Sequence, residues 1–363
     1  MKKNKNYVDL KEQPVPEGQH LLEVDDLKMY FHTEDGVVRA VDGVSYTLDR
    51  GETLGVVGES GSGKSVTAMT IMGLISMPPG KIEGGDVRYR GRSILEMTEE
   101  EMQHIRGNDI AMIFQDPMTS LNPVYKIGKQ VGEGLRLHRG YSKQEALKRA
   151  TELLDLVGIP EPEKRVNEYP HQFSGGMRQR VMIAMALACD PDILIADEPT
   201  TALDVTIQAQ IIELMQEMQE KNGNAIIMIT HDLGVVADMA DKIMVMYAGR
   251  PVEFGTAEEI FYESRHPYTW GLIRSIPEQA IDEKKPLTPI HGNPPSLMNL
   301  PEGCVFSPRC PYATDKCRKQ RPERVVTESG HYSACHYSGD PEFLKNASET
   351  SRTRKDSKKG GEA

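Results

Sequence analysis

The sequence predicts an α/β fold, in which a mainly parallel sheet is covered by helices and joined by an antiparallel flank. Three observations lead to this class. Short apolar runs rich in Val and Ile alternate with helical patterns along residues 53–249. A glycine-rich loop follows the first of these runs and leads directly into a helical pattern. The stretch 119–189 lacks strand signals and is predicted as a helical subdomain.

The composition argues against several functions. The chain has 363 residues, enough for two or three domains. Its formal charge is −11, from 43 Lys and Arg against 54 Asp and Glu, which argues against binding to a nucleic-acid backbone. The start "MKKNKNYVDLKEQ" has no apolar stretch behind its lysines, and no apolar run approaches the roughly 18 residues of a membrane span. We therefore expect a cytosolic protein without nucleic acid, beginning with a flexible leader over residues 1–19.

Residues 20–262 are expected to form the main domain. Strands near 21–26, 37–48 and 53–57 show β-branched residues in alternation and predict an antiparallel flank that leads into the loop. A parallel core is expected from five runs, separated by helical patterns: "TLGVV", "IAMIF", "ILIAD", "AIIMIT" and "KIMVMYAG".

Two helices are clear from their periodicity. In "SKQEALKRATELLDLVGI", Ser142 and Glu145 form a capping box before periodic leucines. In "VTIQAQIIELMQEMQEKNG", Gly223 offers a C-cap. One face of this second helix is apolar and predicts core packing: Ile207, Ile211, Ile212, Met215 and Met218. The final residues, 341–363, are polar and low in aromatics and predict a disordered tail.

The loop "GESGSGKS" has the spacing of a P-loop, which binds phosphate. Gly58 is followed by four residues and then by Gly63, Lys64 and Ser65, between a strand and a helix. Glycines let backbone N–H groups turn toward a phosphate beside a helix N-terminus, while the lysine reaches the β- and γ-phosphates and the serine binds Mg²⁺. The alternative is a glycine-rich turn that binds nothing. The residues assigned to this site are Gly58, Ser60, Gly61, Gly63, Lys64, Ser65 and Val66.

Two further segments point to nucleotide chemistry. The strand "ILIADEPT" ends in Asp197, placed to hold Mg²⁺, and Glu198, placed to polarise an attacking water. The structural alternative is that this acidic pair is a solvated helix N-cap. In "FSGGMRQR", Ser174, Gly175 and Gly176 precede an apolar helix and offer a second set of free N–H groups for phosphate.

Together these motifs resemble the ATP-binding-cassette (ABC) ATPases. "IFQDP" is similar to the family's Q-loop with Gln115, "TTALD" to its D-loop ending at Asp204, and "ITHD" to its switch histidine, His231. The motifs follow the family's order within residues 20–255. The resemblance implies a P-loop NTPase with a RecA-like core, and an ATP and Mg²⁺ requirement.

The resemblance also implies roles for single residues. Two such domains meet head to tail, so that Ser174, Gly175 and Gly176 contact the partner's nucleotide. Glu198 is implied as the general base and His231 as a contact to the γ-phosphate. Gln115 is implied as a catalytic residue and, with Ser65 and Asp197, as a Mg²⁺ ligand. Phe31 is the expected adenine-stacking aromatic, with Tyr30 as its rival.

Each of these smaller assignments has a structural alternative. Gln115 could be a surface loop residue, His231 a helix N-terminal residue and Phe31 a core aromatic, and only their ordered occurrence favours the functional interpretation. One departure from the family concerns "FSGGMRQR", which stands in the place of the family's signature segment. It has Phe173 and Met177 where the family usually has leucine and glutamine, so it is open whether Met177 makes the contact that the glutamine makes in the family.

The last hundred residues resemble a narrower group. "HPYTWGLIRSIPE", "HGNPPSL" and "GCVFSPRCPYATDKC" are similar to the C-terminal region of ATPases that power bacterial oligopeptide and dipeptide importers, and they predict a C-terminal domain over residues 263–340. Nickel importers share much of this pattern. The signature region is most similar to the D-type ATPase of these systems, whose mate is a different, F-type ATPase.

The resemblance thus implies a peripheral protein on the cytoplasmic face of the membrane. Its implied partners are the F-type ATPase, two permease subunits that contact the helical subdomain, and indirectly an extracytoplasmic peptide-binding protein. The rival class is a soluble ABC protein of DNA repair or translation. Such proteins usually carry two cassettes in one chain, whereas this chain has a single P-loop.

Four of the five cysteines gather near the end of the chain: Cys304, Cys310, Cys317 and Cys335. Thiols stay reduced in the cytosol, so metal ligation is favoured over disulfides. The resemblance implies a [4Fe–4S] cluster, zinc is the alternative, and unligated thiols are the third possibility. His331 and His336 could ligate instead but are expected to be solvated, and Cys189 is expected to be a packing residue.

Overall fold

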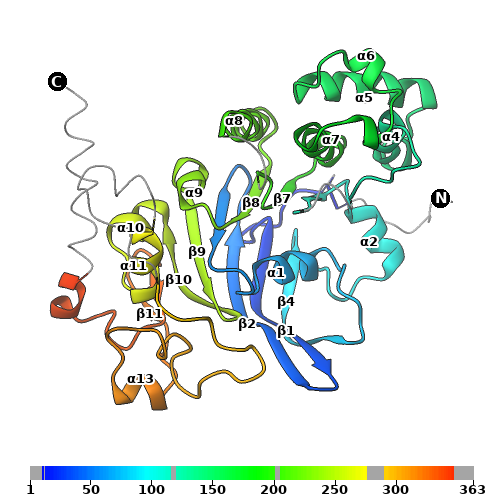
Figure 1. Cartoon of the computed structure of the whole chain (residues 1–363). Coiled ribbons are helices and arrows are strands. Elements are labelled where there is room, and N and C mark those ends of the chain that lie inside the picture. Colours follow the sequence, from blue (N-terminus) through cyan, green and yellow to red (C-terminus); the bar gives the residue numbers. More distant parts are fainter. Residues whose placement is uncertain (1–9, 12, 116–119, 201–204, 276–289, 347–363) are drawn as a thin grey trace, which may run out of the picture.

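The computed structural model describes residues 10–11, 13–115, 120–200, 205–275 and 290–346, and Figure 1 shows two sheets surrounded by helices. The main sheet has the strand order β11-β12-β10-β9-β3-β8-β7-β6. Its strands are β3 (Thr53–Val57), β6 (Ile110–Ile113), β7 (Ile193–Asp197), β8 (Ala225–Thr230), β9 (Lys242–Tyr247), β10 (Arg250–Thr256), β11 (Val325–Val326) and β12 (Tyr332–Ser333).

The centre of the main sheet is parallel. Strands β9, β3, β8, β7 and β6 pair in parallel, with Leu54 opposite Ile227 and Leu194 opposite Ile226. Every residue of β3, β7 and β8 is buried, as expected for strands with both faces covered. The five strands predicted for the parallel core are therefore confirmed.

The second sheet is antiparallel and has the order β2-β1-β4-β5. Its strands are β1 (Leu22–Thr33), β2 (Gly36–Leu48), β4 (Gly80–Tyr89) and β5 (Arg92–Ser93). β1 extends well beyond the predicted 21–26, and the prediction ended near Asp26, where φ is 45° and the pairing register shifts. A bulge at this point interrupts the alternation of side chains by which the strand was predicted.

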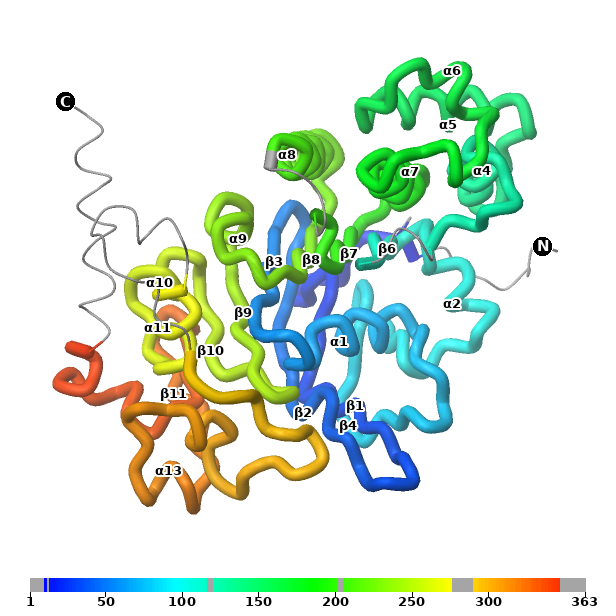
Figure 2. The backbone as a smooth tube through the Cα atoms, in the orientation of Figure 1, coloured from blue at the N-terminus to red at the C-terminus, as the bar shows by residue number. Residues whose placement is uncertain are grey.

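Some helices lie against the sheets, and others lie at one end of the molecule, away from the sheets (Figure 1). They are α1 (Lys64–Ile71), α2 (Glu99–Ile105), α4 (Ile127–His138), α5 (Lys143–Leu156), α6 (Pro162–Arg165), η1 (Pro170–Gln172), α7 (Gly175–Leu187), α8 (Val205–Asn222), α9 (Leu233–Met239), α10 (Ala257–Tyr262), α11 (Pro267–Arg274) and α13 (Asp315–Lys319). Figure 2 shows α4 to α7 at one end of the molecule and the C-terminal segment at the other.

The predicted helical elements agree with the structure where it describes them. Within residues 120–189 the secondary structure consists of helices alone, and α5 begins with the capping box of Ser142 and Glu145. Helix α8 ends before Gly223, whose φ of 66° suits a C-cap. Ile211, Met215 and other residues of its predicted apolar face join the core cluster below the helical subdomain.

The predicted leader, residues 1–19, and the predicted tail, residues 341–363, each contain residues that are packed or helical in the structure. Leu10, inside the predicted leader, is buried against the core that lies between the two sheets. At the other end, residues 341–346 are helical and Phe343 packs against Trp270, with 5.3 Å between ring centroids. The predicted leader and tail therefore include residues that pack on the domain, since Leu10 and Val15 anchor the first and Phe343 the second.

The C-terminal segment continues the main sheet. β12 pairs with β10, so that Phe254 lies opposite Tyr332, and the segment's Val305 and Phe306 share a core cluster with β9. The predicted separate domain over residues 263–340 is thus joined to the sheet of the nucleotide-binding domain.

Candidate functional site

The P-loop connects β3 to α1, and two of its glycines are required by close contacts. A Cβ on Gly58 would lie 2.2 Å from the carbonyl oxygen of Met246, and one on Gly63 would lie 2.3 Å from that of Ala40. Both residues also have positive φ, 152° and 100°. Ser60 and Gly61 form the exposed crest of the loop, where a ligand can approach.

Lys64, the first residue of α1, is buried inside this loop. Its Nζ donates to the carbonyl oxygens of Gly58 at 2.7 Å and Glu59 at 2.9 Å. Burial lowers the pKa of Lys64, while the nearby carboxylates of Glu198 and Asp197 raise it. An ammonium group that lies on its own loop carbonyls can exchange them for phosphate oxygens, so the loop fits an incoming phosphate chain.

Ser65 and Asp197 meet beside the loop. The Ser65 hydroxyl donates to Asp197 Oδ1 at 3.0 Å. Burial raises the pKa of Asp197, and the Ser65 hydrogen bond and the charge of Lys64 oppose this shift. Hydroxyl and carboxylate oxygens are the ligands that Mg²⁺ prefers, so this pair fits the ion that accompanies a nucleotide.

Glu198 joins the two other predicted catalytic residues. Gln115 Nε2 donates to its Oε2 at 3.0 Å, and His231 Nδ1 lies 3.4 Å from its Oε1. Glu198 itself has a φ of 48°, and its backbone N–H donates to Ile229 O at 2.8 Å. A non-glycine residue in this region is uncommon and clusters at functional sites. The ends of β6, β7 and β8 thus bring Gln115, Glu198 and His231 together.

The signature segment lies apart from the P-loop of the same chain. Ser174 caps α7, its hydroxyl accepting from the Met177 N–H at 3.3 Å, and Gly175 and Gly176 form the first turn. Ser174 and Gly175 are exposed, and α7 is well separated from α1 in Figure 1. This arrangement leaves the free N–H groups at the start of α7 open to a ligand from outside the chain.

The two departures in the signature have a structural role. Phe173 is buried in the core of the helical subdomain, and the Arg165 guanidinium lies 5.9 Å from its ring centroid. Met177 is half-buried against the same core. These residues therefore pack the subdomain beside the exposed serine and glycine.

The structure says less about the remaining residues that the sequence assigned to nucleotide binding. The Tyr30 hydroxyl donates to Asp42 Oδ1 at 2.9 Å, whereas Phe31 is half-buried and packs against the core between the sheets. Val66 packs against that core from α1. Asp204 lies outside the described residues, so the D-loop prediction is untested.

A large apolar groove that the sequence did not predict lies next to the Q-loop. Its volume is about 520 Å³, and it opens between α1, β6 and α7. Leu74 and Phe114 are about two-fifths exposed along it, at 40% and 39%. Its lining residues are Met72, Leu74, Arg106, Gly107, Ala111, Met112, Phe114, Ser120, Met182, Met185 and Ala186. Phe114 precedes Gln115, so the groove adjoins the predicted catalytic residues along the chain.

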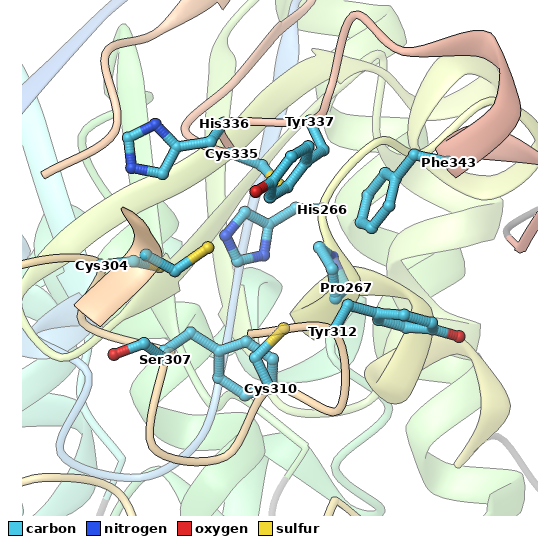
Figure 3. Close-up of a pocket in the computed structure, with 12 residues that line it drawn as sticks. His266, Pro267, Cys304, Ser307, Cys310, Tyr312, Cys335, His336, Tyr337 and Phe343 are labelled. Atoms are coloured by element: carbon cyan, nitrogen blue, oxygen red, sulfur yellow. The ribbon is translucent and has the colours of Figure 1, made fainter. Parts of the chain in front are cut away.

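The four clustered cysteines line one small cavity of about 20 Å³, together with His266 and several aromatic rings. Figure 3 shows the sulfurs of Cys304 and Cys310 pointing into it around His266. Burial raises the pKa of Cys310 to about 11 and that of Cys335 to about 12, so these thiols are protonated at neutral pH. Within the described part of the chain, no three His, Cys, Asp or Glu side chains form a group arranged to hold a metal ion.

The two histidines near Cys335 in the sequence, His331 and His336, differ in burial and in hydrogen-bond partner. His331 was expected to be solvated, but it is buried and its Nε2 lies 3.0 Å from Glu253 Oε1. His336 is half-buried beside the cavity, and its Nε2 contacts Gln320 O at 2.9 Å. Cys189 packs in the core of the helical subdomain, as predicted.

The fold and the site together define a P-loop ATPase of the ABC class. Residues 41–201 match the ABC transporter family, and residues 252–317 match the C-terminal region of oligopeptide/dipeptide transporters. An ATP-binding cassette solved as a dimer with ADP and Pi, MJ0796, is 29% identical with a TM-score of 0.60, over 65% of this chain and 98% of that one.

Two curated relatives are similar over most of their length. The oligopeptide transport ATP-binding protein OppD of Bacillus subtilis is 58% identical, over 86% of this chain and 87% of its own. The dipeptide transport ATP-binding protein DppD of Escherichia coli is 52% identical, over 87% of this chain and 96% of its own. This chain therefore belongs to the ATP-binding subunits of the oligopeptide/dipeptide ABC transporter family.

Among the residues that the structure describes, no helix is both long and apolar enough to cross a membrane.

Proposed function

We propose that this chain is the ATP-hydrolysing subunit of an ABC importer and energises the uptake of oligopeptides or dipeptides through a membrane permease. One observation carries the proposal. In a chain 58% identical to an oligopeptide transport subunit, Glu198 contacts both Gln115 and His231 beside a P-loop. A cytoplasmic, peripheral position at the membrane follows from this function.

The mechanism assigns one task to each residue of the site. Lys64 and the N–H groups of the P-loop bind the phosphates of ATP, and Phe31 stacks on the adenine. Ser65, Asp197 and Gln115 are the residues that hold Mg²⁺, which neutralises phosphate charge when it is bound. Glu198 accepts the proton of the attacking water, and His231 orients that carboxylate and reaches toward the γ-phosphate.

A second ATPase subunit completes the site. Ser174 and Gly175 are exposed and Gly176 is half-buried at the start of α7, and these three residues reach the nucleotide held by the partner's P-loop. We propose that this partner is a different, F-type subunit and that Asp204 lies at the contact between the two. Binding of ATP then closes the pair of subunits, and hydrolysis opens it again.

The apolar groove between α1, β6 and α7 supports a contact with the permease. It adjoins Gln115, so a permease segment seated there would move together with the Q-loop. Cargo specificity then resides in the permease and in an extracytoplasmic peptide-binding protein.

In proteoliposomes that contain both permeases and both ATPase subunits, we expect ATP-dependent uptake of a labelled tripeptide. Leu74→Glu places a charge in the groove and is expected to reduce uptake by about tenfold or more, because desolvating a carboxylate in an apolar contact weakens docking by at least about 1.4 kcal/mol. In cells that express the permeases, the Leu74→Glu chain should also be found in the soluble fraction instead of the membrane fraction.

The matched control is Leu156→Glu on α5, a leucine of similar exposure, 44%, that does not line the groove. It is expected to retain wild-type uptake. Uptake of labelled nickel but not peptide would assign the chain to a nickel importer, and membrane association without the permeases would contradict the importer assignment.

We further propose that Cys304, Cys310, Cys317 and Cys335 ligate a [4Fe–4S] cluster in the C-terminal domain, with zinc as the alternative. The four thiols line one cavity and all are reduced, so the donors are of the kind that such a centre uses, although in the described residues they are not arranged to hold a metal ion. Binding would require the sulfurs to move closer together and to release their protons. With four covalent bonds, a cluster would stabilise this irregular segment without carrying electrons.

Protein purified without oxygen is expected to contain about four irons and four acid-labile sulfides per chain. Cys310→Ala should lose this content and the accompanying visible absorption, because it removes one of the ligands. Iron and sulfide analysis measures the result, and Cys189→Ala, which alters a buried thiol outside the cavity, is the control that keeps the content. One zinc without sulfide would instead indicate a plain structural clamp.

A further inference from the structure

The C-terminal segment contacts the P-loop directly, through Arg309 and Glu59. Arg309 Nη1 donates to Glu59 Oε2 at 2.6 Å, and Nη2 donates to Oε1 at 2.9 Å. Two parallel bonds of this kind form the bidentate geometry in which arginine holds a carboxylate most strongly. The Arg309 side chain is 5% exposed and that of Glu59 is 27% exposed, so solvent screens this pair only in part.

The guanidinium is held in place from its other side. Arg309 Nε donates to His291 O at 2.9 Å, and Nη2 also donates to Ile290 O at 3.1 Å. The backbone N–H of Arg309 donates to Phe306 O at 3.0 Å, and the Phe306 ring packs against Tyr247 and Tyr268 at 5.2 and 5.4 Å. The arginine therefore reaches the P-loop from a packed and hydrogen-bonded segment.

Glu59 is the residue between Gly58 and the exposed crest of the loop, and each of its polar groups has a partner. Its N–H donates to the Tyr268 hydroxyl at 2.9 Å, and Tyr268 also belongs to the C-terminal region. Its carbonyl oxygen accepts from Lys64 Nζ and from the Ser62 N–H. The conformation at the start of the P-loop thus depends on two residues that lie outside the nucleotide motifs.

The charge of Glu59 bears on the same site. Its carboxylate is among the groups that raise the pKa of Lys64, so it lies within electrostatic reach of the ammonium that binds phosphate. A carboxylate without a partner would repel a nucleotide that carries several negative charges. In the structure the guanidinium of Arg309 neutralises this carboxylate.

We propose that Arg309 is a positioning residue for nucleotide binding, which fixes Glu59 by two hydrogen bonds and cancels its charge so that the P-loop accepts the phosphates. This inference rests on the proposed ATPase function. It makes the C-terminal segment part of the nucleotide site in addition to any role in metal binding.

The test uses the full-length chain and titration with Mg·ADP by calorimetry, since ADP is bound but not hydrolysed. Arg309→Met is expected to raise the dissociation constant by about tenfold, because it leaves Glu59 unpaired near the phosphates. The loss should shrink at high salt, because salt screens the repulsion. Glu59→Gln combined with Arg309→Met removes both charges and is expected to return the constant to within about threefold of wild type.

Arg149→Met is the matched control, because it breaks an exposed Arg–Glu pair of 3.1 Å on α5. It should bind Mg·ADP like the wild type. If Arg309→Met does not fold, Arg309→Lys replaces it, since an ammonium cannot form two parallel bonds, and binding about threefold weaker than wild type is expected.

The outcomes separate the two proposals. Wild-type affinity in Arg309→Met or in its lysine replacement overturns the role of Arg309, and so does a double variant as weak as Arg309→Met alone. A wild-type chain that binds neither ADP nor ATP would overturn the proposed function instead.

Discussion

Replacing Glu198 with glutamine is expected to reduce ATP turnover of the assembled transporter by about a thousandfold while nucleotide binding persists. An amide has nearly the shape of the carboxylate but cannot accept the proton of the attacking water. The φ of 48° at position 198 is equally accessible to either side chain. Phosphate release measures the turnover, and retention of labelled ATP after gel filtration measures the trapped complex.

Glu152→Gln is the control for this substitution. Glu152 pairs with Arg149 on the surface of α5, so its loss should leave turnover within about twofold of wild type. Turnover of Glu198→Gln within a few-fold of wild type would show that another group takes the proton. Loss of both turnover and ATP binding would indicate damage to the P-loop, because the Glu198 N–H donates to Ile229 O of β8, and β8 pairs with β3, the strand before that loop.

The cluster of Gln115, Glu198 and His231 was predictable in its members but not in its contacts. Gln115, Glu198 and His231 belong to segments that each follow an apolar run, and parallel strands bring such ends to one edge of the sheet. Their order along the chain therefore predicted a shared site. The hydrogen bond from Gln115 to Glu198 and the 3.4 Å contact between His231 and Glu198 depend on side-chain conformations that no local pattern encodes.

The parts that the sequence did not predict are short or irregular. The run "GKIEGGDVRY" forms β4 although its glycines and charges obscure the alternation of a strand. β11 and β12 have two residues each, too few for any periodic signal, yet β12 joins the C-terminal segment to β10. Because that junction depends on distant pairing, the motifs of the segment predicted a C-terminal domain without showing its connection to the sheet.

The contact between Arg309 and Glu59 was missed for the same reason. The two residues are separated by 250 positions, and each is an ordinary charged residue in its local sequence. Arg309 lies between Ser307 and Cys310 in a stretch whose cysteines attract attention to metal binding. A P-loop whose second residue is acidic is the one local hint that a cation has to come from elsewhere.

Lys64→Ala is expected to weaken binding of Mg·ATP by about a hundredfold or more. The ammonium donates two hydrogen bonds to Gly58 O and Glu59 O, and a phosphate chain would take over both. Charge-assisted bonds contribute about 1.5–3 kcal/mol each, so the loss of two corresponds to at least about two decades in the dissociation constant. Calorimetric titration with Mg·ATP in the Glu198→Gln background measures the affinity without hydrolysis.

Lys164→Ala provides the comparison, because Lys164 is 66% exposed and pairs with Glu161 on the surface. It should bind Mg·ATP as the wild type does. A Lys64→Ala chain with unchanged affinity would mean that the loop N–H groups alone hold the phosphates, and that the buried ammonium only closes the empty loop. The thermal midpoint separates these cases. If the lysine only stabilises the empty loop, Lys64→Ala lowers the thermal midpoint and leaves the nucleotide affinity of the folded protein unchanged.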